Sequence, residues 1–283
     1  MPPPTTKIGA HVSIAGGVFN APLRAKEEGC ETFQCFTRSP QGGPAPELTD
    51  KVISSFKRNM RTTGIDRFYI HAPYYINLAS LVDRIRRSSI AVIREELERG
   101  SILGGRFVMF HPGSYTDQTL EEATAKVQDA LGQILDGYSG SCKLLIEISA
   151  GSGNVLGDTF REVADMMKTV TGLAGFGGVC FDTCHAFASG YDFRTPDTAA
   201  AMLREFDSII GLKWLKLTHV NDSKADLGGR KDRHEHVGLG HIGTAGLSEL
   251  LKTPPFSRID WLLETQSEGR GADIEALARI RGV

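Results

Sequence analysis

The 283-residue sequence has no run of about 18 consecutive apolar residues, so no membrane-spanning helix is expected. Its first residues, MPPPTTK, lack the apolar core of a secretory signal, and we expect a cytoplasmic protein. An excess of basic residues is also missing, since 32 Lys and Arg stand against 34 Asp and Glu. A nucleic-acid partner would therefore need local positive charge, from a surface patch or from bound metal cations.

The five cysteines form no Cys-x-x-Cys pair and no even-numbered framework, which excludes a disulfide-stapled fold. We expect reduced, buried thiols, although Cys180 and Cys184 could alternatively contribute to a metal site. The segment Gly238–Gly243 matches the dinucleotide-binding pattern G-x-G-x-x-G, but it follows a charged loop rather than a strand. We interpret it as a turn or as a loop that approaches substrate closely.

Eight short runs rich in β-branched and aromatic residues alternate with helix-like segments along the chain. The expected strands are Lys7–Val12, Glu31–Phe36, Arg67–His71, Arg106–His111, Lys143–Ile148, Gly177–Asp182, Trp214–Val220 and Asp260–Glu264. Amphipathic spacing predicts helices, among them Ala79–Gly100, Thr119–Leu135 and Thr159–Val170, with C-cap glycines at Gly29, Gly64, Gly100 and Gly172. The Pro- and Gly-rich segment Ser39–Pro46 is predicted to be a loop.

Eight strand–helix units predict an α/β fold, a single (β/α)8 TIM barrel with its active site at the C-terminal rim of the strands. The absence of a linker or a break in composition indicates one domain over residues 1–283, with residues 1–6 as a flexible N-terminal tail. Polar side chains stand at the carboxyl ends of the expected strands or just beyond them: His71, His111, Glu147, Asp182, His185, His219 and Glu264.

Each of these histidines could by itself be a satisfied core residue, but their gathering at one rim favours a metal site. Carboxylates such as Glu147 and Glu264, inside apolar runs, are costly to bury without compensating positive charge. The charged loop that follows adds Asp232 and His234, whose spacing lets both side chains point the same way in an extended chain. Alone, that pair would be typical of a solvated surface loop.

The candidate ligands are imidazoles and carboxylates without thiolate, a set that suits Zn²⁺, with Mn²⁺ or Fe²⁺ possible. Calcium and an all-protein magnesium site are disfavoured. The nine candidates are too many for one tetrahedral ion and suffice for two or three ions if one carboxylate bridges. Two ions about 3.5–4 Å apart are suited to in-line phosphoryl displacement.

At these residues the chain resembles the endonuclease IV family of apurinic/apyrimidinic endonucleases, from about Lys7 to Thr265. The matching segments are Ile8–Gly17, Tyr75–Leu78, Phe110–Ser114, Asp182–Tyr191, His219–Lys224, Asp232–His234, Gly240–Gly243 and Leu263–Thr265. The resemblance implies a three-zinc barrel that cleaves the phosphodiester 5′ to abasic sites in double-stranded DNA, leaving a 3′-hydroxyl. It also implies the trimming of blocked 3′ ends, and a monomer is expected.

The resemblance further implies how the ligands divide among the three ions. His71, His111 and Glu147 would hold the first, Glu147, Asp182, His219 and Glu264 the second, and His185, Asp232 and His234 the third. Glu147 would bridge two ions and act as the catalytic residue that orients or deprotonates the attacking water, and His11 would be an active-site neighbour.

Two segments depart from the family pattern. Ile148 stands where the family has Asn, and Gln41 stands where the loop after the second strand carries a DNA-inserting arginine. Tyr74 matches the inserting tyrosine of the next loop, and Arg38 is a candidate for a replacement DNA contact.

Two further functions are compatible with these residues. A metal-dependent sugar isomerase or epimerase would share the barrel and the rim carboxylates, but it would not need Asp232 and His234. A metal-binding structural protein would keep every ligand and bind DNA without turnover. Turnover of free sugars, or DNA binding without cleavage, would distinguish these two from the nuclease.

Overall fold

The computed structural model describes residues 6–282, and within this range no helix is long and apolar enough to cross a membrane. The strands are β1 (Ile8–His11), β2 (Thr32–Cys35), β3 (Phe68–His71), β4 (Phe107–Phe110), β5 (Lys143–Glu147), β6 (Phe176–Asp182), β7 (Leu215–His219), β8 (Asp222–Ser223), β9 (His234–Glu235) and β10 (Trp261–Leu263). The α-helices are α1 (Ala21–Glu27), α2 (Asp50–Thr63), α3 (Asp83–Leu103), α4 (Leu120–Leu135), α5 (Phe160–Met167), α6 (Thr183–Ala188), α7 (Pro196–Ile209), α8 (Gly243–Leu251) and α9 (Arg270–Arg281).

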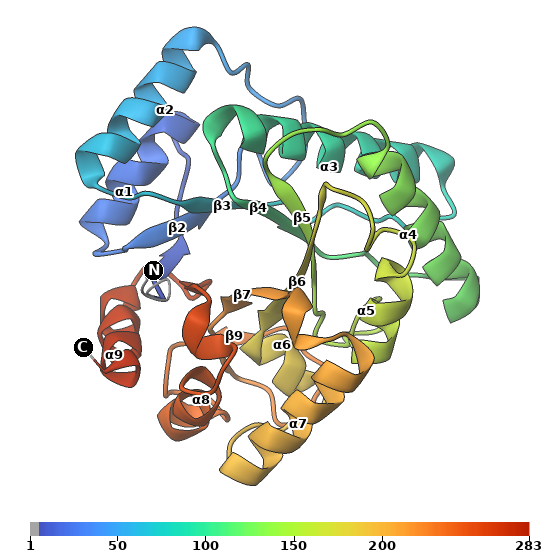
Figure 1. The fold of residues 1–283 in the computed structure, drawn as a ribbon, viewed down its shortest axis with the longest axis vertical. Helices are drawn as coiled ribbons and strands as arrows, with labels where there is room; N and C mark the ends of the chain where they lie inside the picture. The colour runs from blue at the N-terminus through green and yellow to red at the C-terminus, as the bar shows by residue number, and fades with distance from the viewer. Residues whose placement is uncertain (1–5, 283) are drawn as a thin grey trace.

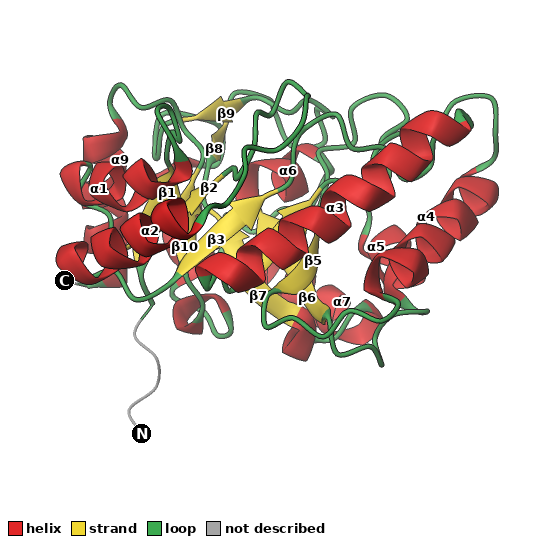
Figure 2. Ribbon diagram, turned by 90° about the horizontal axis from the view of Figure 1, so that it is seen from above, coloured by secondary structure: helices red, strands yellow, loops and turns green. Residues whose placement is uncertain are grey.

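Eight parallel strands close into a barrel in the order β1-β10-β7-β6-β5-β4-β3-β2, with the long helices packed around it (Figures 1 and 2). Every expected strand coincides with an observed barrel strand, and its ends differ by no more than one residue. The prediction of a TIM barrel is confirmed. The two remaining strands, β8 and β9, form a small antiparallel pair that the strand pattern did not predict.

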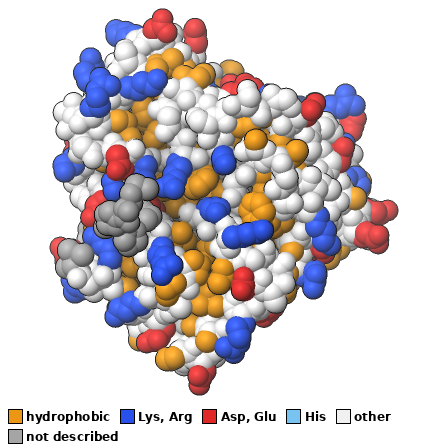
Figure 3. All heavy atoms as spheres, viewed as in Figure 1, with side chains coloured by type: hydrophobic (Ala, Val, Ile, Leu, Met, Phe, Trp, Pro, Cys, Tyr) orange, Lys and Arg blue, Asp and Glu red, His pale blue; other side chains and the backbone are white. Residues whose placement is uncertain are grey.

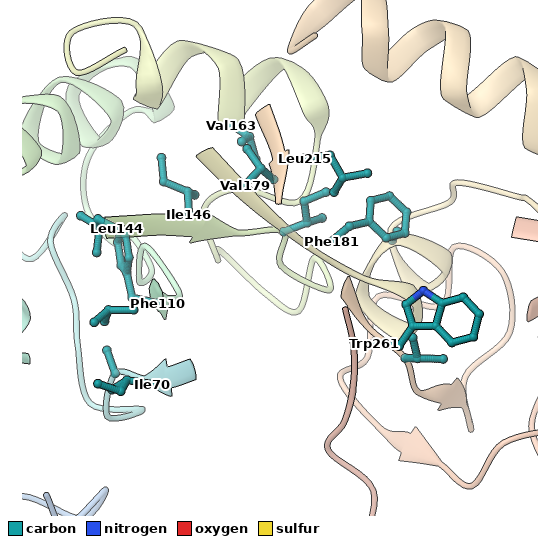
Figure 4. Close-up of a cluster of buried hydrophobic side chains, with 14 of the residues drawn as sticks. Ile70, Phe110, Leu144, Ile146, Val163, Val179, Phe181, Leu215 and Trp261 are labelled. Atoms are coloured by element: carbon teal, nitrogen blue, oxygen red, sulfur yellow. The ribbon is translucent and has the colours of Figure 1, made fainter. Parts of the chain in front are cut away.

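The apolar core has two parts, as expected when successive strand residues point to opposite faces of a barrel sheet. The interior of the barrel holds a small cluster of seven side chains, Tyr69, Phe107, Met109, Leu145, Cys180, Leu217 and Leu262. The larger part lies between the strands and the surrounding helices, and it includes Leu144 and Ile146 of β5 together with Val163 of α5 (Figure 4). This alternation along β5 sets the direction of the next residue, Glu147.

Two of the predicted helix caps are wrong. Gly64, with φ 74°, ends α2 as expected, and Gly29 follows α1 with φ 80°. However, α3 begins at Asp83 and continues through Gly100 to Leu103, so Gly104, with φ 87°, is its cap. Gly100 has another role, because a Cβ there would lie 2.7 Å from the Cys142 sulfur. Gly172 caps nothing, since α5 ends at Met167.

The expected N-terminal tail lies outside the described residues except for Thr6. Thr6 is buried, and its hydroxyl donates to the backbone oxygen of Ser257 over 2.8 Å, so it is part of the barrel rather than of a tail. Figure 3 shows the molecule from the side of Figure 1, with lysine and arginine side chains scattered among apolar ones. The predicted loop over Ser39–Pro46 is confirmed.

Candidate metal centre

Six of the candidate ligands share one barrel mouth because each follows an inward-facing apolar residue by two positions. A residue two places further along a strand points to the same face. Tyr69, Met109, Leu145, Cys180, Leu217 and Leu262 fill the barrel interior, and they lead to His71, His111, Glu147, Asp182, His219 and Glu264. Because the strands are parallel, these six side chains converge at the carboxyl-terminal mouth.

The other three candidates come from α6 and from the β8–β9 hairpin. Asp182 is the N-cap of α6, and its Oδ1 accepts the backbone N–H of His185 over 2.8 Å, which places that histidine beside the mouth. In the hairpin Ser223 pairs with His234, so the charged loop folds back over the rim. The Nε2 atom of His185 then lies 3.2 Å from Oδ1 of Asp232 and 3.3 Å from Nε2 of His234.

The structure brings the nine candidates into three neighbouring groups, in each of which the ligand atoms lie within 4.8 Å of one another. The groups are His71, His111 and Glu147; Glu147, Asp182, His219 and Glu264; and His185, Asp232 and His234. Glu147 belongs to the first two, as a bridging carboxylate would. Imidazole and carboxylate donors at this separation suit a zinc-type ion.

Two cysteines lie at the edge of these groups, Cys180 near Glu147 and His219, and Cys184 near Asp182 and His234. Burial raises the pKa of the Cys180 thiol to about 12, and it also raises the pKa of Cys184. A metal binds thiolate rather than thiol. The raised pKa values of the two thiols therefore favour the histidines and carboxylates as ligands.

Glu147 is the electrostatic centre of the cluster. Its side chain is fully buried, with Oε1 2.8 Å from Nδ1 of His219 and Oε2 3.1 Å from Nε2 of His71. Burial alone would raise the pKa of Glu147, but the neighbouring His219 and His111 outweigh it and hold this pKa well below its usual value. The carboxylate is therefore ionised and needs positive charge close by.

The third group shows the same mutual stabilisation of opposite charges. Burial lowers the pKa of His185, but Asp182 and Asp232 outweigh it and raise this pKa to about 10. Burial raises the pKa of Asp232, but His185 outweighs it and brings this pKa to about 2. The buried Glu147 and Asp182 thus share one mouth with the more exposed Glu264 and Asp232, with histidines as their partners. A divalent cation would neutralise such a cluster of negative charge.

Backbone oxygens orient two of the histidines. Nδ1 of His71 lies 2.6 Å from the backbone oxygen of Ala72, and Nδ1 of His185 lies 2.9 Å from that of Ile148. A partner on one ring nitrogen leaves the other free for a metal. The Ile148 side chain is buried, and the hydrogen bond to His185 uses its backbone oxygen, which any residue at this position would supply.

The glycine-rich segment Gly238–Gly243 binds a side chain of the β8–β9 hairpin, where a dinucleotide-binding motif would bind a nucleotide. Asp222 is fully buried and accepts the backbone N–H groups of Gly238, Ile242 and Gly243 over 2.9–3.3 Å. A Cβ on Gly240 would lie 2.5 Å from Oδ1 of Asp222, so this position needs glycine. The motif is a turn wrapped around a carboxylate.

A cleft of about 760 Å³ opens over the ligand groups. Tyr74, which is 66% exposed, lines it and lies in edge contact with Phe36 at a ring distance of 5.4 Å. Two cations that we did not single out from the sequence, Lys224 and Arg233, also line the cleft. Both flank ligand segments, a position that could have revealed them.

Arg38, the candidate for a replacement DNA contact, is buried and does not line the cleft. Its side chain is 3% exposed, and its Nε donates to Oε1 of Glu96 over 2.6 Å, while Glu95 pairs with the same guanidinium. It is held against α3 instead of facing the cleft. Two other polar residues that we did not predict, Gln34 and Asn221, contact the ligands, with Asn221 Nδ2 donating to Asp182 over 2.7 Å. In the sequence, the role of Gln34 could have been suspected because a polar residue stands there within the otherwise apolar run Phe33–Phe36.

Comparison with known proteins adds independent information. A family model described as xylose isomerase-like TIM barrel matches residues 22–281. The chain is 36% identical over 276 residues to a protein of Halothermothrix orenii named probable endonuclease 4, covering 97% of this chain and 99% of that protein. The crystal structure of endonuclease IV from Thermus thermophilus superposes with a TM-score of 0.82 at 33% identity, covering 97% of each chain.

More distant likeness extends to sugar-converting barrels. The crystal structure of a D-tagatose 3-epimerase-like protein gives a TM-score of 0.73 at 20% identity, over 97% of this chain and 98% of that one. At this identity the likeness shows the shared barrel alone, because one barrel hosts many activities.

Proposed function

The chain belongs to the endonuclease IV family, and on that premise we propose that it is a zinc-dependent enzyme of DNA repair that cuts at abasic sites. It hydrolyses the phosphodiester bond 5′ to the lesion in double-stranded DNA, leaves a 3′-hydroxyl and also trims blocked 3′ ends. Family membership makes it a nuclease acting on DNA. The zinc requirement, the number of ions and the lesion are the further content of the proposal.

One observation carries the proposal: nine histidine and carboxylate side chains form three groups with ligand atoms within 4.8 Å, and the buried Glu147 belongs to two of them. A sugar epimerase would not need the third group of His185, Asp232 and His234, in which the β8–β9 hairpin brings Asp232 and His234 to His185 of α6. Three ions, one in each group, would supply Lewis acidity and activate water for attack on phosphorus.

The residues around the groups have separate tasks in this reaction. Glu147 holds its position through His71 and His219, and it orients the attacking water or accepts its proton. Lys224 and Arg233, which line the cleft, bind backbone phosphates and so add local positive charge to a chain of net charge −2. Tyr74 projects from the loop after β3, where it can fill the space of a missing base.

Abasic nucleotides suit such a site on energetic grounds. A nucleotide without a base neither pairs nor stacks, so extruding it from the duplex costs less than extruding an intact one. The cleft of about 760 Å³ over the ligands has room for a sugar–phosphate unit. Selectivity then rests on the cost of deforming the DNA as well as on direct contacts.

Cleavage of a duplex with one abasic-site analogue tests the proposal, with the product ends mapped and an undamaged duplex as the control. We expect a cut 5′ to the analogue that disappears after exhaustive chelation and returns with zinc. A metal-loaded protein that leaves the analogue intact while converting free sugars would overturn the proposal in favour of the epimerase function.

A further inference from the structure

We propose that Gln34 is a positioning residue that fixes the tautomer of His219 and holds Glu264, so that one ligand group is prepared before an ion binds. This inference rests on the proposed function, because it takes the group of Glu147, Asp182, His219 and Glu264 as a metal site. Gln34 lies in β2, outside every ligand group, and contacts the ligands only through its side-chain amide.

The amide of Gln34 makes hydrogen bonds through both its oxygen and its nitrogen. Its side chain is fully buried, and Oε1 accepts a hydrogen bond from Nε2 of His219 over 2.8 Å. Its Nε2 donates to Oε1 of Glu264 over 2.6 Å and to Nδ1 of His11 over 3.0 Å. Gln34 and His11 are paired across β1 and β2 in the barrel register, so the strands themselves hold the amide in place.

The carboxylate of Glu264 decides which way the amide points. If the amide were turned over, its oxygen would face a carboxylate oxygen at 2.6 Å, and two acceptors would meet with no hydrogen between them. The NH₂ group therefore faces Glu264, and Oε1 is left to face His219. An amide oxygen can only accept, so Nε2 of His219 must carry the proton.

This tautomer directs the lone pair of His219 toward the other ligands. A neutral imidazole with its proton on Nε2 has its free lone pair on Nδ1. Nδ1 is the nitrogen that lies 2.8 Å from Oε1 of Glu147 and 3.4 Å from Oε2 of Glu264. Two acceptors at 2.8 Å need positive charge between them, which a proton on Nδ1 supplies in the ion-free protein and a bound ion would supply in its place. Metal-binding histidines commonly donate their second N–H to an oxygen that fixes the ring, and here the amide of Gln34 supplies that oxygen.

A neutral amide suits this place better than a carboxylate would. A glutamate at position 34 could accept from His219, but it would bring a second negative charge against Glu264 at the same 2.6 Å separation. The amide accepts on one side and donates on the other, so it orients one ligand of each kind without adding charge. It also leaves Nδ1 of His11 as an acceptor, which puts the proton of that neutral ring on Nε2.

The test is the metal content of Gln34→Leu, a variant of similar size that keeps none of these hydrogen bonds. We expect its affinity for one ion to fall about 10–100-fold, the usual effect of losing such an outer partner, while the group of His185, Asp232 and His234 keeps its ion. That group does not include Gln34, so it reports on folding within the same molecule. The matched control is Gln128→Leu, which removes a partly buried hydrogen bond to Asp165 between α4 and α5.

Metal bound per chain would be measured after dialysis against graded concentrations of chelator, with zinc as the metal. Equal retention of zinc by Gln34→Leu and the wild type would overturn the inference and leave the proposed function untouched. A wild-type protein that binds no zinc would instead refute the proposed function.

Ring nitrogen NMR of the zinc-loaded wild type tests the inference even if the variant does not fold. Long-range proton–nitrogen spectra show which ring nitrogen of each histidine carries the proton. We expect protonated Nε2 in His219 and in His11. A proton on Nδ1 of His219 would contradict the assignment directly.

Discussion

Replacing Arg38 by methionine tests whether this residue stabilises the fold or contacts DNA. The side chain is 3% exposed, and its Nε donates to the fully buried Glu96 over 2.6 Å. In Arg38→Met, Glu96 keeps the Thr37 hydroxyl, at 2.6 Å, as its remaining hydrogen-bond donor. Arg99 stays nearby, bound to Thr37 and to the backbone of Pro46. The variant thus leaves a buried carboxylate with half of its direct partners.

The expected cost follows from that geometry. Removing one partner of a buried ion pair costs about 3–5 kcal/mol, and the remaining Thr37 hydroxyl places this variant at the lower end, about 3 kcal/mol. At about 2 °C per kcal/mol for a chain of this size, the melting temperature should fall by about 6 °C. Arg38→Met combined with Glu96→Leu should recover part of the loss, because the unpaired charge is then gone.

Thermal unfolding and the salt dependence of DNA binding together form the assay, with an uncleavable abasic duplex as the ligand. Arg38→Met should leave the slope of log affinity against log salt unchanged. Arg233→Ala, at the cleft, should reduce that slope by about 0.9 for each lost phosphate contact while the melting temperature stays constant. An Arg38→Met protein with unchanged melting temperature and a reduced slope would refute the structural role.

Four other variants test the site and its supports. Glu147→Gln should lower abasic-site cleavage about 10²–10⁴-fold in a folded protein, because the carboxylate at the centre of the cluster is lost, and wild-type nicking would contradict this role. Burial and Asp158 raise the pKa of Glu162 from 4.5 to about 7, so the folded state holds a proton that the unfolded state releases, and stability falls as pH rises through that window. The melting temperature of Glu162→Gln should therefore exceed that of the wild type at pH 8.5 and equal it at pH 4. The same difference in melting temperature at both pH values would exclude a contribution from the protonation of Glu162. Gly240→Ala should destabilise by about 1–3 kcal/mol, since its Cβ would lie 2.4 Å from the backbone oxygen of Ser223. Gly132→Ala in α4, with open space around it, should instead stabilise the protein by about 0.5–1 kcal/mol. Denaturant titration of both glycine variants beside the wild type measures these changes in the free energy of unfolding.

The strand pattern predicted the barrel well because each strand is short, buried and flanked by turns, so its bounds are visible locally. Caps were harder to predict, since a glycine can be required by packing as well as by a helix end. Gly100 illustrates this, because Cys142, distant in sequence, leaves no room for a side chain there. The small hairpin escaped prediction because strands as short as Asp222–Ser223 and His234–Glu235 carry no periodicity.

The sequence by itself determined the barrel and the chemical nature of its mouth. An inward-facing apolar residue two positions before each of six ligands fixes where those side chains point, and parallel strands bring their ends together. Only the tertiary structure decided what depends on partners distant in the chain. It buried Arg38 against Glu96, which lies 58 residues away, and placed Gln34 between His219 and Glu264, 185 and 230 residues away. Hydrogen bonds and ion pairs form between whichever groups folding brings within about 3 Å, and no local pattern records those encounters.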